Sequence, residues 1–151
     1  ESEIKEHNKV FKYRISKFLS ENKSEERIKF LPRCDNNNFY NYIYFSSFIF
    51  DCLSWSGGNT HLEALAFDKP IITMEGKNLK QNHTFGFLKR INQNHLIASN
   101  EREYIDKILE FSKSKNLVNK SKEEISNNKN LLFRDMECIK SLEDSLMKNL
   151  F

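Results

Sequence analysis

The stretch SWSGGNTHLEALAFDKPIIT, residues 54–73, decides the fold of this chain. It follows FIFDCL, residues 48–53, an apolar run whose length predicts a strand that is buried on both faces. Residues 59–67 have helical character, and Pro70 prevents the helix from continuing. The β-branched run IITM, residues 71–74, predicts the next strand. Strand, helix and strand in this order predict two parallel strands joined by a crossover helix.

The same alternation continues on both sides of this stretch. Further strands are predicted at residues 27–31 and 95–98, and further helices at residues 4–19, 38–46, 79–91, 116–127 and 131–150. Ser99 begins a predicted capping box with Glu103, which starts one more helix. We therefore expect an α/β protein with a Rossmann-like parallel sheet flanked by helices and with a helical C-terminus. Ligands of such sheets bind beyond the carboxyl ends of the strands.

Two adjacent glycines, Gly57 and Gly58, stand where the predicted strand passes into the helix. A helix N-terminus has unpaired N–H groups and a partial positive charge, and glycine lets the backbone approach an anion closely and adopt positive φ. We therefore expect Gly57, Gly58, Asn59 and Thr60 to hold phosphate, and Glu63 to accept hydrogen bonds from a ribose diol. The alternative is a tight strand-to-helix connection with an N-cap. The turn is neither GxGxxG nor a Walker loop, so neither a dinucleotide fingerprint nor a nucleoside triphosphatase is favoured.

Composition restricts the class of protein. The 151 residues include 38% hydrophobic and 30% charged residues, which suits one globular domain. The net charge of +3 comes from 24 basic and 21 acidic residues, a balance that does not indicate a nucleic-acid partner. No apolar run approaches the roughly 20 residues of a membrane span, and the highly charged residues 1–9 do not predict a signal peptide.

The cysteines and histidines give no sign of a metal site. Cys34, Cys52 and Cys138 are widely spaced, with no CxxC pair, so we expect reduced thiols and a cytoplasmic location. The histidines lack metal-ligand spacing, and His61 and His83 are expected to be surface or capping residues.

The segment GGNTHLEALAFDKPIITMEG, residues 57–76, resembles the nucleotide-sugar-binding segment of GT-B glycosyltransferases, most of all the O-linked N-acetylglucosamine transferase and SPINDLY-like family. The positions that match the family pattern are Gly57, Gly58, Asn59, Thr60, Glu63, Leu65, Pro70, Thr73, Met74 and Gly76. Three further segments resemble the family in the same order: RIKFLPRCDNNN, SSFIFDCLSW with Asp51 at the acidic position, and HLIASNEREY. The resemblance covers about residues 3–110.

The resemblance implies a donor site for a UDP-sugar. Residues 57–60 would hold the diphosphate, Glu63 the ribose hydroxyls, and the backbone around Arg33 and Cys34 the uracil. The UDP-sugar would be a substrate, transferred to a protein or glycan hydroxyl, and neither a cofactor nor a metal is expected. The chain would be a single nucleotide-sugar-binding domain over residues 1–151, truncated at its N-terminus.

Several positions depart from the family pattern. The family often has His at the position of Gly58 and Thr at that of Asn59, and its base-binding loop has Lys and His at the positions of Asn36 and Phe39. Phe39 either stacks on a base or is a core aromatic residue. Arg33, Lys77 and Lys80 either supply the missing positive charge or are solvated surface residues.

The departures leave more than one function open, including a different nucleotide-sugar enzyme of GT-B-like shape, such as an epimerase, whose catalytic residues would lie outside this chain. In GT-B enzymes an acceptor-binding half precedes the donor half, so the chain is not expected to be active alone and no general base can be named in it. The alternative function is a non-catalytic α/β module that has lost nucleotide binding and binds a partner protein. That alternative would use the aromatic residues 39–44 and the apolar side of the last helix, with Ile139, Leu142, Leu146 and Leu150.

Overall fold

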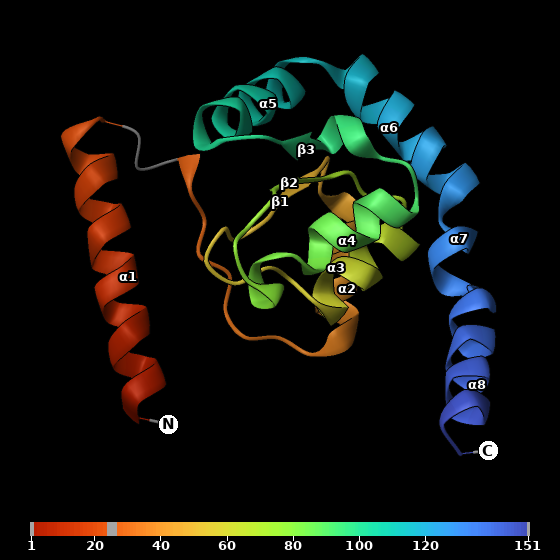
Figure 1. The fold of residues 1–151 in the computed structure, drawn as a ribbon. Coiled ribbons are helices and arrows are strands. Elements are labelled where there is room, and N and C mark those ends of the chain that lie inside the picture. Colours follow the sequence, from red (N-terminus) through yellow and green to blue (C-terminus); the bar gives the residue numbers. More distant parts are fainter. Residues whose placement is uncertain (1, 24–26, 151) are drawn as a thin grey trace. The chain divides into compact units, whose positions relative to one another are not determined.

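The computed structural model describes residues 2–23 and 27–150, with side chains over 8–23 and 27–149, and it divides into two compact units, Glu1–Asp35 and Asn36–Phe151 (Figure 1). The first unit contains helix α1 (Ser2–Glu21), which confirms the helix predicted at residues 4–19. The ring of Phe11 on α1 packs edge-on against Phe30, with 6.3 Å between the centroids. The strand predicted at residues 27–31 is wrong: residues 28–35 form neither helix nor strand, since they pair with no strand of the described chain.

The second unit is built on a parallel sheet of three strands, β1 (Ile49–Phe50), β2 (Ile71–Met74) and β3 (Ile97–Ala98), in the order β1-β2-β3. Ile49 lies opposite Ile71 in the first pair, and Thr73 lies opposite Ile97 in the second. The run IITM forms the central strand, as predicted, because its β-branched residues are buried on both faces of the sheet.

Helices cover both faces of this sheet. Figure 1 shows α5 (Glu101–Lys113) on one side of the strands and α3 (Asn59–Ala66) and α4 (His83–Arg90) on the other, and all three contact β2. Helix α2 (Asn36–Phe45) adds Ile43 to the apolar core. The other core side chains include Leu65, Ile71, Ile72, Leu88, Ile91, Leu96, Phe111 and Ile125. The expectation of an α/β fold with a parallel sheet flanked by helices is confirmed.

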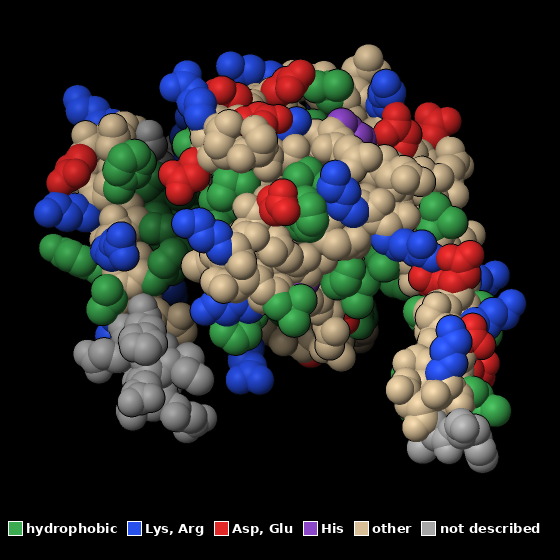
Figure 2. Space-filling model, viewed as in Figure 1, with side chains coloured by type: hydrophobic (Ala, Val, Ile, Leu, Met, Phe, Trp, Pro, Cys, Tyr) green, Lys and Arg blue, Asp and Glu red, His purple; other side chains and the backbone are tan. Residues whose placement is uncertain are grey.

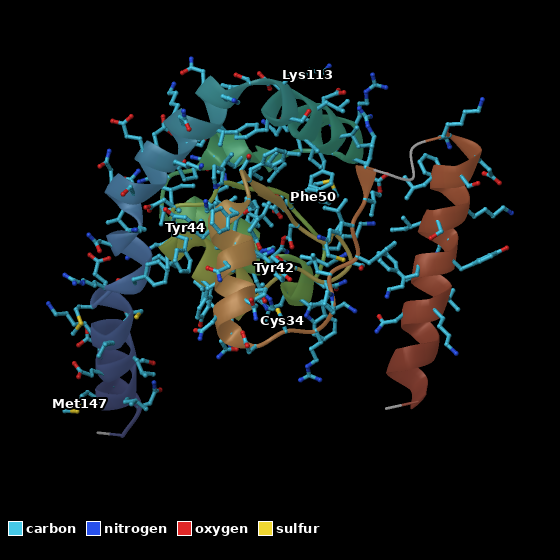
Figure 3. The ribbon with its side chains drawn as sticks, turned by 180° about the vertical axis from the view of Figure 1, so that it is seen from behind. Cys34, Tyr42, Tyr44, Phe50, Lys113 and Met147 are labelled. Carbon is cyan, nitrogen blue, oxygen red and sulfur yellow. The ribbon has the colours of Figure 1, made fainter. Side chains whose placement is uncertain are left out.

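The first strand differs from its prediction. Only Ile49 and Phe50 of residues 48–53 pair with β2, and the side chain of Phe50, labelled in Figure 3, is 61% exposed. The prediction of a strand buried on both faces is therefore wrong. Strand β1 stands at the edge of the three-stranded sheet, with no neighbouring strand on one side among the described residues.

Hydrogen bonds between side chains and the backbone accompany breaks in two of the predicted helices. The helix expected at residues 79–91 is a short 3₁₀ helix, η2 (Leu79–Gln81), followed by α4, because the amide of Asn82 bonds the backbone N and O of Gly76 and turns the chain. The helix expected at residues 131–150 is split into α7 (Asn130–Phe133) and α8 (Glu137–Leu150). Asp135 causes this split, since its carboxylate accepts the N–H of Glu137 at 3.0 Å and starts the second helix anew.

The strand predicted at residues 95–98 is confirmed only in its second half, because only Ile97 and Ala98 pair with β2. A 3₁₀ turn, η3 (Asn94–Leu96), leads into β3, and α6 (Lys115–Asn128) covers the helix expected at residues 116–127. The cap of α5 is Asn100 rather than Ser99: Asn100 accepts the N–H of Glu103, and the carboxylate of Glu103 accepts the N–H of Ser99 at 2.8 Å. None of the described helices is both long and apolar enough to cross a bilayer.

Candidate functional site

The glycine turn lies at the carboxyl end of β1 and opens α3, as the sequence predicts. Gly58 is the N-cap residue, with no side-chain cap bond, and its carbonyl accepts the N–H groups of His61 and Leu62. Among the described residues, no group accepts the N–H of Gly58, Asn59 or Thr60, and the side chains of Asn59 and Thr60 are exposed. These unpartnered donors therefore lie together at the N-terminal end of α3, which also bears the positive end of the helix dipole.

The surroundings of Gly57 and Gly58 differ, so glycine is needed for a different reason at each position. A Cβ on Gly57 would lie 2.6 Å from the imidazole ring of His61, so only glycine fits beneath that ring. A Cβ on Gly58 would meet nothing nearer than Nδ1 of His83, at 4.0 Å, so the surface there is open to an approaching group. Neither glycine has positive φ, so close approach is the property of glycine that is relevant here.

A buried carboxylate lies inside the turn. Asp51, the residue after β1, is 3% exposed and accepts hydrogen bonds from Ser56 Oγ at 2.6 Å, Thr73 Oγ1 at 2.8 Å and the N–H of Gly57 at 3.0 Å. The N–H of Gly57 is therefore turned inward to Asp51. The phosphate-binding role predicted for Gly57 stays a prediction, and it would have to rely on close approach rather than on this N–H.

Thr84 connects the turn to α4. Its N–H donates to Ser56 Oγ at 3.0 Å, and its hydroxyl lies 3.3 Å from the carbonyl of Gly57 and 2.6 Å from Nδ1 of His61. The sequence showed no sign of Ser56 or Thr84 as site residues, because neither belongs to a recognisable motif. The glycine turn and the starts of two helices are thus joined by one buried polar cluster, which consists of Asp51, Ser56, His61, Thr73 and Thr84.

His61 belongs to this cluster, so its expected surface position is wrong. The residue is 7% exposed, and its Nδ1 lies 3.6 Å from the carboxylate of Asp51. Burial lowers the pKa of His61 below its ordinary value, and the nearby carboxylate opposes this shift only in part. His83 is half-buried as the first residue of α4, and its buried Nδ1 has no hydrogen-bond partner among the described residues.

Glu63 is half-buried on α3 and is oriented by a tyrosine of α2. The hydroxyl of Tyr40 donates to Oε1 of Glu63 at 3.3 Å, and the ring of Tyr40 packs against Phe67 with 5.8 Å between the centroids. Phe39 packs against the apolar core, which favours the structural alternative for that residue.

The other two predicted binding residues belong to a different unit from the turn. Arg33 is exposed and Cys34, labelled in Figure 3, is half-buried, and both belong to the first unit, whereas residues 57–63 belong to the second. Their expected contact with uracil therefore stays a prediction. Lys80 lies beside the turn: its carbonyl accepts the N–H of Ser56 at 2.8 Å, and its Nζ lies 5.6 Å from the ring centroid of the exposed Trp55.

The described part of the chain gathers no three His, Cys, Asp or Glu side chains in a way that could hold a metal ion. The three cysteines are not joined in disulfides.

The comparisons with known proteins bear on the fold. No protein-family model matches the chain, and no curated protein matches it in sequence. Among solved structures, a mutant of the O-GlcNAc transferase of Thermobaculum terrenum matches 92% of this chain with a TM-score of 0.78 and 22% sequence identity. The chain spans 27% of the length of that protein. The resemblance inferred from the sequence is therefore confirmed at the level of structure: this chain has the fold of one part of an O-GlcNAc transferase.

Proposed function

We propose that this chain is a nucleotide-sugar-binding domain, spanning residues 1–151, of a glycosyltransferase that uses a UDP-sugar. The observation that carries the proposal is the open N-terminus of α3. Its free N–H groups at Gly58, Asn59 and Thr60 stand at the carboxyl end of a parallel sheet, where ligands of such sheets bind. The shared fold with an O-GlcNAc transferase supports the same function by analogy.

The diphosphate would lie against residues 58–60. The backbone N–H groups would donate to its oxygens, and the exposed hydroxyl of Thr60 and amide of Asn59 would add side-chain donors. Because these donors are already in place before the sugar leaves, they would stabilise the negative charge that develops on the departing UDP. This mode of stabilisation needs no metal ion.

The nucleoside would extend from the turn along α3. Glu63 would accept hydrogen bonds from the ribose hydroxyls in the orientation that Tyr40 gives it. The backbone around Arg33 and Cys34 would face the uracil. Transfer of the sugar to a protein or glycan hydroxyl would require the acceptor-binding half of the enzyme, so we expect this chain alone to bind UDP without transferring a sugar.

Calorimetric titration with UDP tests the proposal. The wild-type chain is expected to bind UDP, and Glu63→Ala and Gly58→Val are expected to weaken binding. The single tryptophan of the chain, Trp55, lies next to the turn, so its fluorescence supplies a second readout of the same titration. Leu142→Ala on α8 is the matched control, because that side chain is 62% exposed and belongs to another element. Absence of UDP binding at millimolar concentration would contradict the proposal.

One observation favours the second candidate, a non-catalytic module that binds a protein. Helix α8 exposes three residues of the predicted apolar row, Ile139, Leu142 and Leu146, each at least 45% exposed, and Met147 beside them is 60% exposed. The side chain of Leu150, the fourth residue predicted for this row, lies outside the described residues. Figure 2 shows acidic and basic side chains on the side of α8 that faces the viewer, and Figure 3, seen from behind, labels Met147. An amphipathic helix of this kind is typical of helices that pack on a partner.

The mass of the chain in solution distinguishes the two candidates. Size-exclusion chromatography with light scattering is expected to show self-association or capture of a defined partner if α8 is an interaction helix, and Leu142→Glu should abolish it. A chain that binds UDP and stays monomeric favours the nucleotide-sugar site instead.

A further inference from the structure

Asp51 is buried directly beneath the glycine turn, although nothing in the proposed donor chemistry needs a carboxylate there. The side chain is 3% exposed, and burying a charged group is costly unless hydrogen bonds compensate. Three donors converge on it: the hydroxyls of Ser56 and Thr73 and the N–H of Gly57. These three hydrogen bonds hold the carboxylate of Asp51 in one orientation.

These bonds determine which way the turn faces. The N–H of Gly57 points inward to Asp51, and the carbonyl of Gly57 is within 3.3 Å of the hydroxyl of Thr84. Both backbone groups of Gly57 therefore have partners inside the protein. The next residues, from Gly58 onward, are the ones whose N–H groups are left without partners on the open side.

The position of Asp51 itself is fixed from a second direction. The hydroxyl of Tyr104, on α5, donates to the backbone carbonyl of Asp51, and burial raises the pKa of Tyr104 to about 12. The side chain of Asp51 thus holds the turn, while its backbone is held by a helix on the opposite face of the sheet.

We propose that Asp51 is a positioning residue for the diphosphate site, which it orients through Gly57 and Ser56 without touching the ligand. This inference rests on the proposed function and goes beyond it by assigning the residue that sets the direction of the free N–H groups. Loss of the carboxylate would let the turn rotate, so that the N–H groups of residues 58–60 no longer point to one place.

Two substitutions that nearly keep the size of the side chain distinguish a role in positioning the turn from a contribution to stability alone. Asp51→Asn keeps the shape of the side chain but puts an amide N–H₂ where a carboxylate oxygen accepted hydrogen bonds. Tyr104→Phe removes the hydroxyl that holds the backbone of the same residue and leaves the carboxylate and the turn in contact. Both should lower the thermal midpoint, and calorimetry with UDP on the purified full chain measures affinity for each.

Asp51→Asn is expected to weaken UDP binding about tenfold, because a hydrogen bond to a charged acceptor is stronger than one to a neutral acceptor. Tyr104→Phe is expected to leave affinity within about twofold of the wild type. In ¹H–¹⁵N spectra, Asp51→Asn should shift the amide proton of Gly57 upfield even without UDP. If Asp51→Asn fails to fold, Ser56→Ala takes its place and should also weaken UDP binding, by less than about tenfold.

The outcomes bear on the two proposals differently. No UDP binding by the wild type would overturn the proposed function and this inference with it. Equal UDP affinity of the wild type and Asp51→Asn would overturn the positioning role and leave the donor site intact. Equal losses of affinity in Asp51→Asn and Tyr104→Phe would also overturn the positioning role, since they would show that both residues act only through stability.

Discussion

The hydroxyl of Tyr40 donates to the carboxylate of Glu63 across the interface between α2 and α3, at 3.3 Å. Tyr40 and Glu63 are 23 positions apart in the sequence, and the ring of Tyr40 is held in turn by Phe67. The carboxylate proposed to meet the ribose is therefore restricted in its rotamers before any ligand arrives. Such preorganisation increases affinity because fewer conformations are lost on binding.

Tyr40→Phe tests this relationship. The substitution keeps the ring and its packing against Phe67 but removes the donor to Glu63, so UDP affinity is expected to fall about threefold while the thermal midpoint changes little. Calorimetry with UDP and with 2′-deoxy-UDP measures the effect. Because Glu63 is proposed to contact the ribose hydroxyls, the ratio of the two affinities should shrink in Tyr40→Phe.

Glu63→Gln is the control for that experiment, since it removes the charge while keeping the size of the side chain. It should reduce discrimination between the two nucleotides more than Tyr40→Phe does. An unchanged ratio in both variants would show that Glu63 does not meet the ribose.

The two glycines of the turn are expected to respond differently to alanine. At Gly57 the added methyl group would lie 2.6 Å from the ring of His61, and such overpacking costs about 1–3 kcal/mol. At Gly58 the nearest atom is 4.0 Å away, so no clash is created and the loss of stability should be smaller. Urea denaturation of both variants measures the difference, and each variant is the control for the other.

UDP affinity should show the opposite order. The methyl group of Gly58→Ala points to the open surface where the diphosphate is proposed to lie. This variant should therefore lose more UDP affinity than Gly57→Ala, although it loses less stability. Equal stability losses at both positions would show that the contact between Gly57 and His61 is not the reason for glycine there.

The parts of the fold that the sequence predicts well are those determined by neighbouring residues. The strand IITM, the helix that starts at Asn59 and the cap near Ser99 depend on local propensity and capping, which short windows of sequence display. The breaks at Asn82 and Asp135 were missed because each depends on one side chain that bonds the backbone in place of continuing a helix.

The candidate site was predicted only in its outer part for a related reason. The glycine turn and Glu63 lie in one continuous motif. The cluster beneath them joins Ser56 to Thr84 over 28 positions, and Asp51 to Tyr104 over 53. Contacts of this range leave no periodic pattern in a single sequence. The sequence therefore marked Asp51 only as an acidic position of the family pattern, and its hydrogen-bond partners and those of Thr84 came from the structure.

Lys69 is expected to contribute to stability because, unlike most lysines, it is buried. It is 6% exposed, and its ammonium donates to the carbonyls of Tyr44 and Ser46 at 2.6 and 3.1 Å, at the end of α2. Lys69→Met would leave these carbonyls without a donor, which should cost about 2 kcal/mol in urea denaturation. Burial is the main cause that lowers the pKa of Lys69, and the charge of Lys122 adds to it.

Lys122→Met is the matched control, because it removes a lysine of the same neighbourhood that repels Lys69. This variant should be as stable as the wild type or slightly more stable. A Lys69→Met variant as stable as the wild type would show that water replaces the ammonium at the end of α2.

The stability of the chain is expected to fall as the pH falls through the ordinary histidine value of 6.5, because burial lowers the pKa of both His61 and His95 in the folded state. In the unfolded chain both imidazoles take up a proton near that pH, whereas the folded chain resists it. The unfolded state then binds more protons, so acid favours unfolding, and the contribution of each histidine is fully present only above pH 6.5.

Urea midpoints measured between about pH 8 and pH 5 test this, since histidine titrates in that range. His61→Gln can still donate to Thr84 but cannot titrate, so it should flatten part of the slope, and adding His95→Gln should flatten most of the rest. Glu103, whose pKa is lowered to about 2 chiefly by hydrogen bonds from Ser99, loses its contribution only between pH 4.5 and about 2, below this window. A double variant with the full wild-type slope would contradict the assignment of the pH dependence to these two histidines.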